Sequence, residues 1–341
     1  MNISIRKLYL ASSIKYSTAT AALEHIKKKK MNHKPNRNSI RLRSIFGIML
    51  AAVATLGLVS CGNGNGCKGA KKEMVTVSIP PIKYLVDRIS GNELDVNVMV
   101  ATGACQETYE PTPVQMKDVA KSSIFFGISN LEFEQKWLQN IKANNAKLSY
   151  KNLAEGIYEE PEACTHTEAE HEHGHHHSHG GVDPHFWLSP KNYKAMAQAA
   201  YNELVRLFPS NKEAYTRNYN ALTASIDSVD AAAKSKLINL TNKKFIIYHP
   251  ALSYFAKDYG MEQISIEKDG KEPDANHIKE LVTIAKTNGI KKIFVQKEFD
   301  MSIIKSFAGE IGATIEPINT FAYDWVGNMN QIIETLYSAN R

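Results

Sequence analysis

The chain has 341 residues, of which 12 are histidine, and a formal net charge of +6. Its basic excess lies in residues 1–60, which hold 11 lysines and arginines and one acidic residue, so the remainder carries 30 basic and 34 acidic side chains. The charge of the whole chain therefore gives no support to nucleic-acid binding. The four cysteines have no CxxC spacing, which excludes a multi-disulfide framework.

The N-terminal part carries an export signal. Residues 41–61 join basic residues to an apolar stretch that ends in Cys61, and the run Leu58–Gly62 is similar to a bacterial lipobox. We expect residues 1–61 to contain a miscalled start, with translation beginning at Met31, followed by a lipoprotein signal peptide whose Cys61 receives the lipid. A transmembrane anchor is the alternative, although the apolar stretch is short for one. Residues 62–73 are rich in Gly, Asn and Lys, which is typical of a flexible tether.

Residues 74–210 alternate short apolar runs with helical patterns. Strands are predicted at 74–80, 94–100, 122–129 and 147–153, and helices at 81–91, 114–121, 131–143 and 191–208. This βαβα order predicts a mostly parallel sheet covered by helices. The lobe includes a polar loop at 151–182, which is too long for an ordinary connection.

A long helix and a second α/β series complete the chain. Residues 211–240 contain no Pro or Gly and have apolar residues near helical spacing, which predicts a helix of about 40 Å. In residues 241–341, strands are predicted at 243–249, 261–267, 290–296 and 313–318, and helices at 251–259, 276–289, 301–310 and 324–339. The sequence thus predicts two similar α/β lobes of mostly parallel sheet joined by one long backbone helix, with a binding site in the cleft between the lobes.

The loop at 151–182 holds most of the histidines. Clustered imidazoles indicate transition-metal handling, and this composition cannot form a core. Residues 171–175 also match the H-E-x-x-H string of zinc proteases, but that chemistry needs a stable helix, so we expect no enzyme. We expect a mobile auxiliary metal-binding arm, made of His166, His171, His173, His175, His176, His177 and His179.

Five ordered motifs in residues 74–341 resemble the family of metal-binding lipoproteins that serve ABC importers as zinc or manganese receptors. The motifs are GACQETYEPTP at 103–113, DPHFWLSP at 183–190, YHPALSYF at 248–255, KEPDANHIKELV at 271–282 and IFVQKEFD at 293–300. The resemblance implies a two-lobed fold and a metal ion held between the lobes.

The resemblance also implies metal ligands. His185 and His249 match ligand histidines of the family, and His249 stands at the end of a predicted strand, where α/β folds collect ligands. Glu107 stands where many relatives have histidine, so an oxygen donor is expected there, with Glu110 and Cys105 as neighbours that could serve instead. Asp324 falls where relatives supply an aspartate, but it is equally suited to cap the last helix.

Some assignments stay open at this point. The fourth ligand is Asp324, Glu298 or water, and Cys67, Cys105 and Cys164 allow at most one disulfide. Histidine ligands favour Zn²⁺, whereas two carboxylates would suit Mn²⁺, and iron(II) is a further alternative.

The resemblance implies a high-affinity zinc receptor that captures the ion outside the cytoplasm and delivers it to an ABC transporter permease for uptake. We expect the protein to be a monomer anchored by a lipid in the bacterial cell envelope, periplasmic or surface-exposed. Its expected partners are a divalent metal ion and an ABC transporter permease with its ATPase. A metal-buffering or chaperone lipoprotein without a transporter would share the ligands and is the alternative.

Overall fold

The structure is a computed structural model, and it describes residues 72–101, 109–145, 147–157, 182–267, 271–296, 299 and 302–341. Within this part of the chain, no helix combines the length and the apolar character needed to cross a membrane.

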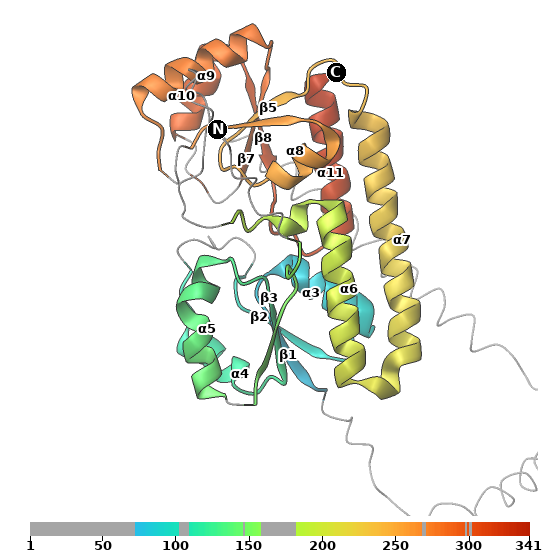
Figure 1. Ribbon diagram of the computed structural model, residues 1–341. Coiled ribbons are helices and arrows are strands. Elements are labelled where there is room, and N and C mark those ends of the chain that lie inside the picture. Colours follow the sequence, from blue (N-terminus) through green and yellow to red (C-terminus); the bar gives the residue numbers. More distant parts are fainter. Residues whose placement is uncertain are drawn as a thin grey trace, which may run out of the picture. The chain divides into compact units, whose positions relative to one another are not determined.

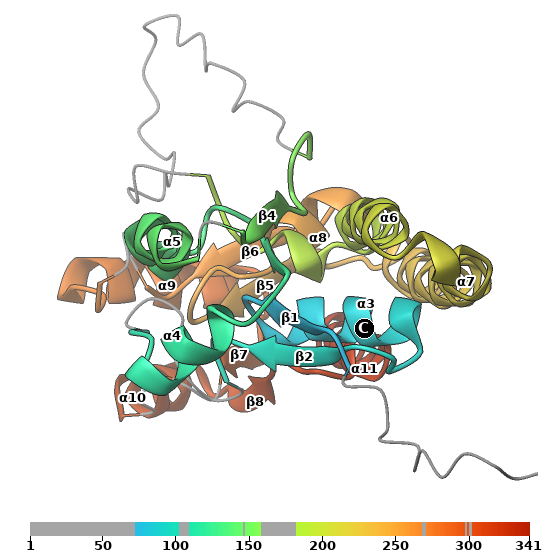
Figure 2. The ribbon, with the colours of Figure 1, turned by 90° about the horizontal axis from the view of Figure 1, so that it is seen from below.

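The first lobe is a four-stranded parallel sheet with the strand order β2-β1-β3-β4. Helices α4 and α5 cover one face of this sheet and α3 covers the other (Figures 1 and 2). Strand β3 is buried along its whole length, as expected for parallel strands covered on both faces. The elements are β1 (Met74–Val77), α3 (Pro80–Ser90), β2 (Asp95–Val98), α4 (Pro113–Val119), β3 (Ile124–Gly127), α5 (Glu132–Asn144) and β4 (Ser149–Asn152).

Two long helices follow the first sheet. A short 3-10 helix, η1 (Phe186–Leu188), leads into α6 (Pro190–Leu207), which begins at Pro190 and is capped by Ser189. After η2 (Pro209–Asn211), helix α7 (Lys212–Leu237) runs for 26 residues beside α6 (Figure 1). Helix α7 also contacts α3 of the first lobe and α11 of the second, so it joins both lobes along its length.

The second lobe repeats the arrangement of the first. Its parallel sheet has the order β6-β5-β7-β8, with α9 and α10 on one face and α8 and α11 on the other (Figures 1 and 2). The elements are β5 (Lys244–Ile247), α8 (Ser253–Tyr259), β6 (Glu262–Ser265), α9 (Ala275–Thr287), β7 (Lys292–Gln296), α10 (Ser302–Ile311), β8 (Thr314–Ile318) and α11 (Trp325–Asn340).

The predicted fold class is therefore confirmed: two similar parallel α/β lobes are joined by one long helix. A large hydrophobic core continues from the first sheet through α6 and α7 to α11, and a smaller core lies between the second sheet and helices α9 and α10. Because the two sheets have the same strand order, positions at the ends of β1 and β5 are equivalent, as are those at the ends of β3 and β7.

Candidate metal centre

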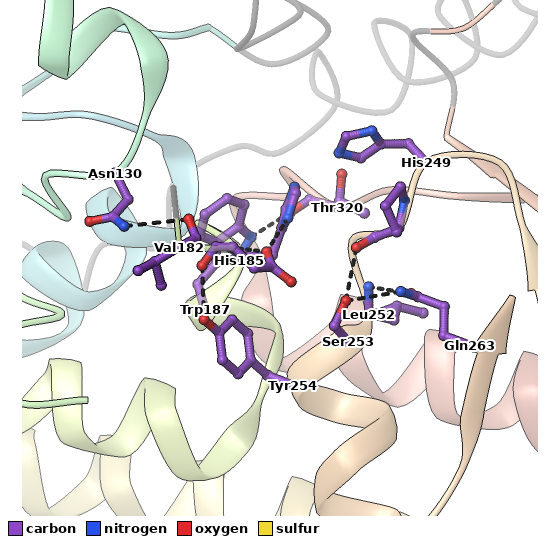
Figure 3. Close-up of polar contacts among 12 residues, drawn as sticks. Asn130, Val182, His185, Trp187, His249, Leu252, Ser253, Tyr254, Gln263 and Thr320 are labelled. Carbon is purple, nitrogen blue, oxygen red and sulfur yellow. Dashed lines mark hydrogen bonds and ion pairs between the residues drawn. The ribbon is translucent and has the colours of Figure 1, made fainter. Parts of the chain in front are cut away.

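His185 lies in the tight turn that precedes η1 and is 3% exposed. Asp183 holds this histidine twice, because its Oδ1 accepts the main-chain N–H of His185 at 2.9 Å and lies 2.8 Å from the ring Nδ1 (Figure 3). Burial acts to raise the pKa of Asp183, but the interaction with His185 outweighs it and lowers the pKa. An ionised carboxylate can only accept a hydrogen bond, so a neutral His185 would carry its proton on Nδ1 and its lone pair on Nε2.

His249 has an equivalent carboxylate partner in the second lobe. Strand β5 ends at Ile247, and His249 lies in the turn beyond it, 8% exposed. Its Nδ1 lies 3.0 Å from Oε2 of Glu267, which is itself 6% exposed and follows the neighbouring strand β6. Here too the carboxylate lies at Nδ1, so Nε2 is on the side of the ring that does not contact Glu267.

The two histidines come from the turn before η1 and from the end of β5 in the second lobe, and they lie side by side. Their ring centroids are 5.1 Å apart, with an angle of 67° between the ring planes. Aromatic rings flank the pair, because Trp187 is tilted against His185 at 5.2 Å and Phe299 is stacked on His249 at 5.6 Å. These neighbours restrict the rotation of both imidazoles, which is the arrangement expected of preorganised metal ligands.

Asp324 does not join this pair. It is exposed, and its Oδ1 accepts the main-chain N–H of Gly327 at 3.2 Å, which makes it the N-cap of α11. Among the residues that the structure describes, no three His, Cys, Asp or Glu side chains are grouped around one metal position. The structure shows the capping role that the sequence predicted for Asp324, and its role as a metal ligand stays a prediction.

Several predicted site residues lie outside the described residues. These are Glu107 and Cys105, Glu298, Cys61, and the seven histidines of the loop (His166, His171, His173, His175, His176, His177 and His179). Glu110, a neighbour that could have replaced Glu107, is exposed and pairs with Lys136 of α5 at 2.7 Å. The adjacent Tyr109 packs edge-on against Phe133, so the segment that follows Glu107 is attached to α5.

Three contacts of the site were not predicted from the sequence. They are the carboxylates of Asp183 and Glu267 and the side chain of Gln296, which contacts the main chain of His249. Glu267 and Gln296 each stand at the end of a predicted strand, as His249 does. This shared position at strand ends could have predicted the contacts of Glu267 and Gln296 with His249, because the carboxyl ends of neighbouring parallel strands meet at one edge of a sheet.

The fold and the histidine pair together define a class: a two-lobed receptor with a candidate metal site between the turn before η1 and the end of β5. The chain belongs to the family described as "Zinc-uptake complex component A periplasmic", which it matches over residues 75–339.

Individual relatives agree with this assignment. The chain is 29% identical over 283 residues to the high-affinity zinc uptake system protein ZnuA of Bacillus subtilis, covering 80% of this chain and 88% of that protein. It is 26% identical to the manganese ABC transporter substrate-binding lipoprotein PsaA of Streptococcus anginosus, with the same two coverages, 80% and 88%. A crystal structure of ZnuA superposes with a TM-score of 0.70 at 34% identity and covers 80% of this chain and 100% of that one.

Proposed function

We propose that this protein is an extracytoplasmic receptor that binds a zinc ion and delivers it to the membrane permease of an ABC importer. The observation that carries the proposal is the pair formed by His185 and His249, each held at Nδ1 by a carboxylate. Membership in the zinc-uptake family and the names of the relatives support the same function.

The spacing of the two rings suits one shared ion. With a Zn–N distance of about 2.0–2.1 Å and a tetrahedral angle at the metal, two imidazoles that bind through Nε2 have centroids about 5 Å apart. The observed separation is 5.1 Å. Nitrogen donors in a shell of aromatic rings favour zinc, since manganese prefers several oxygen ligands, including water. Manganese, which the name of one relative specifies, is the second candidate ion.

Glu107 is our proposed third ligand. The segment of Tyr109 and Glu110, which follows it directly, is attached to α5 in the first lobe. A carboxylate added to two imidazoles leaves the fourth position of a zinc ion for water or a further donor. Asp324 is not included in this set, because its carboxylate caps α11.

Binding and release involve no covalent step, so the protein acts as a receptor and not as an enzyme. Zinc displaces protons and water from the ligands, which makes its affinity fall as the imidazoles become protonated at acidic pH. We further propose that Cys61 anchors the monomeric protein to the cell envelope by a lipid, and that the histidine arm collects ions near the site.

Competition titrations with zinc, manganese and iron(II) test the proposal. We expect the wild type to bind zinc most tightly, His185→Ala to lose most of this affinity, and a deletion of residues 165–181 to keep it. Equal affinity in His185→Ala and the wild type would contradict the proposed centre. So would loss of all tight binding on deletion of the loop alone.

A further inference from the structure

We propose that Gln296 is a positioning residue for metal binding, because its buried side chain holds the main chain of the metal-binding residue His249. This inference rests on the proposed function, since it concerns how tightly the receptor holds zinc. Gln296 is the last residue of β7, and only 1% of it is exposed.

The contact between Gln296 and His249 involves both hydrogen-bonding groups of the amide. Nε2 of Gln296 donates to the main-chain carbonyl of His249 at 2.7 Å, and Oε1 accepts the main-chain N–H of His249 at 3.3 Å. The side chain thus pairs with the peptide groups of His249 as a neighbouring strand would. The carbonyl of His249 also accepts from the N–H of Ala251 at 2.8 Å, which closes the turn.

The sheet itself does not supply this pairing. Strand β5 is in register with β7 at Ile246 and Ile247, and the last ladder bond runs from the N–H of Tyr248 to the carbonyl of Phe294 at 2.8 Å. Pro250 follows His249 and has no N–H, so the strand cannot continue in the same way. The side chain of Gln296 extends the pairing by one residue, to the residue that carries the metal-binding ring.

The contact with Gln296 fixes the position of the His249 main chain, which sets how far Nε2 of His249 lies from the proposed ion. The Glu267 carboxylate orients the ring of His249 and Phe299 stacks on its face, while the main-chain N–H of Glu267 bonds one residue earlier, to the carbonyl of Tyr248 at 3.1 Å. Zinc–nitrogen distances in protein sites stay within about 0.2 Å of 2.0–2.1 Å. A shift of the His249 main chain would move Nε2 out of reach of an ion held by His185, even if the ring kept its orientation.

The test compares two glutamines that support the same turn. Gln296→Met keeps the length of the side chain and removes both hydrogen bonds to His249. We expect it to weaken zinc binding by about 10- to 100-fold, the range found when a group supporting a metal ligand is lost. Gln296→Asn, whose amide is one methylene too short to make both bonds, provides a milder second variant and should weaken zinc binding to a smaller extent.

The matched control is Gln263→Met. Gln263 accepts from the N–H of Leu252 at 2.7 Å and donates to Oγ of Ser253 at 2.9 Å, just beyond His249 in the same turn (Figure 3). We expect its zinc affinity to stay close to that of the wild type. Two further measurements separate positioning from general destabilisation: the absorption spectrum of the cobalt(II)-substituted protein, which reports ligand geometry, and the hydrogen-exchange rate of the His249 amide in the metal-free protein.

In Gln296→Met we expect an altered cobalt spectrum and faster exchange of the His249 amide, with neither change in Gln263→Met. The inference is overturned if both Gln296 variants bind zinc as the wild type does, or if the two methionine variants weaken binding equally. A wild-type protein that fails to bind zinc would instead overturn the proposed function, and the exchange rate would still decide whether Gln296 holds His249.

Discussion

At the scale of single residues, the candidate site is built from pairs of a histidine and a carboxylate. Asp183 lies two positions before His185 in the chain, whereas Glu267 lies 18 positions after His249 and reaches it across the sheet. Each carboxylate lies against Nδ1 and orients the ring, an arrangement that would leave Nε2 for the proposed ion. Contacts within the protein therefore set the orientation of both rings.

Substitutions of Asp324 distinguish a role as the N-cap of α11 from a role as a metal ligand. Because its carboxylate accepts the N–H of Gly327 at the start of α11, we expect Asp324→Ala to lower the free energy of unfolding by about 0.5–2 kcal/mol. Asp324→Asn, which keeps a capping oxygen, should stay close to the wild type. Urea denaturation measures both changes. Zinc affinity should remain the same in both variants, and a large loss of affinity in Asp324→Asn would restore the aspartate as a ligand.

The contacts of individual residues were predictable to different degrees. His185 and His249 were identified from their motifs, and the strand end that carries His249 was predicted from hydrophobic patterning. The sequence also suggested both roles of Asp324, because an aspartate at this position can cap the following helix or bind a metal ion. The partners of His249 could not be assigned, because contacts over 18 and 47 residues depend on which strands are neighbours in the sheet.

At the scale of elements, each lobe fixes the turn between strand and helix with one buried polar side chain. In the first lobe this is Glu134 of α5, which accepts the N–H groups of Ile128 and Ser129 after β3 and the hydroxyls of Ser78 and Tyr150. Gly127 is required beside it, since an added Cβ would lie 2.7 Å from Oε1 of Glu134. The first lobe thus secures the ends of β1 and β3 with a carboxylate, as the second lobe secures those of β5 and β7 with Gln296.

Burial raises the pKa of Glu134 above its ordinary value of 4.5, and the hydrogen bonds from Ser78, Ile128, Tyr150 and Ser129 only partly oppose this. The folded protein then binds this proton more tightly than the unfolded chain does. The contribution of Glu134 to stability is therefore complete below pH 4.5 and is lost as the pH rises through the raised pKa of the folded state.

The pH dependence of unfolding tests this assignment for Glu134. Glu134→Gln lacks the titration but also lacks one acceptor oxygen, so at low pH we expect it to be less stable than the wild type by about 1–3 kcal/mol. The deficit should shrink as the pH rises from 4 to 8. Urea denaturation at intervals across this pH range measures the difference in free energy of unfolding between the two proteins. Groups that titrate in the same way in both proteins cancel in this difference. A deficit that does not change with pH would contradict the raised pKa.

At the scale of the whole molecule, the turn that carries His185 is bonded directly to the second lobe. Nε1 of Trp187 donates to the carbonyl of Thr320 at 2.7 Å, and the carbonyl of Trp187 accepts from Nε1 of Trp325 at 2.6 Å. The ring of Trp325 in turn stacks on Tyr193 of α6 at 4.0 Å. Beside these contacts, Tyr323 donates to Asp87 of α3 at 2.7 Å.

These contacts predict that stability and metal affinity are coupled at Trp187. Trp187→Phe keeps an aromatic ring against His185 but leaves the buried carbonyl of Thr320 without the indole N–H. We expect a loss of about 1–3 kcal/mol in the free energy of unfolding, the cost of an unsatisfied buried polar group. We also expect weaker zinc binding, because the second lobe then holds the turn of His185 less firmly relative to His249.

Urea denaturation and zinc titration of the same samples measure the two effects together. Trp137→Phe on α5, which makes the same substitution away from the histidine pair, serves as the control and should leave zinc affinity unchanged. If Trp187→Phe lost stability but bound zinc like the wild type, the bond to Thr320 would stabilise the fold without setting the distance between the rings of His185 and His249. If Trp187→Phe binds zinc more weakly and Trp137→Phe does not, zinc affinity depends on the bonds that hold the turn of His185 against the second lobe.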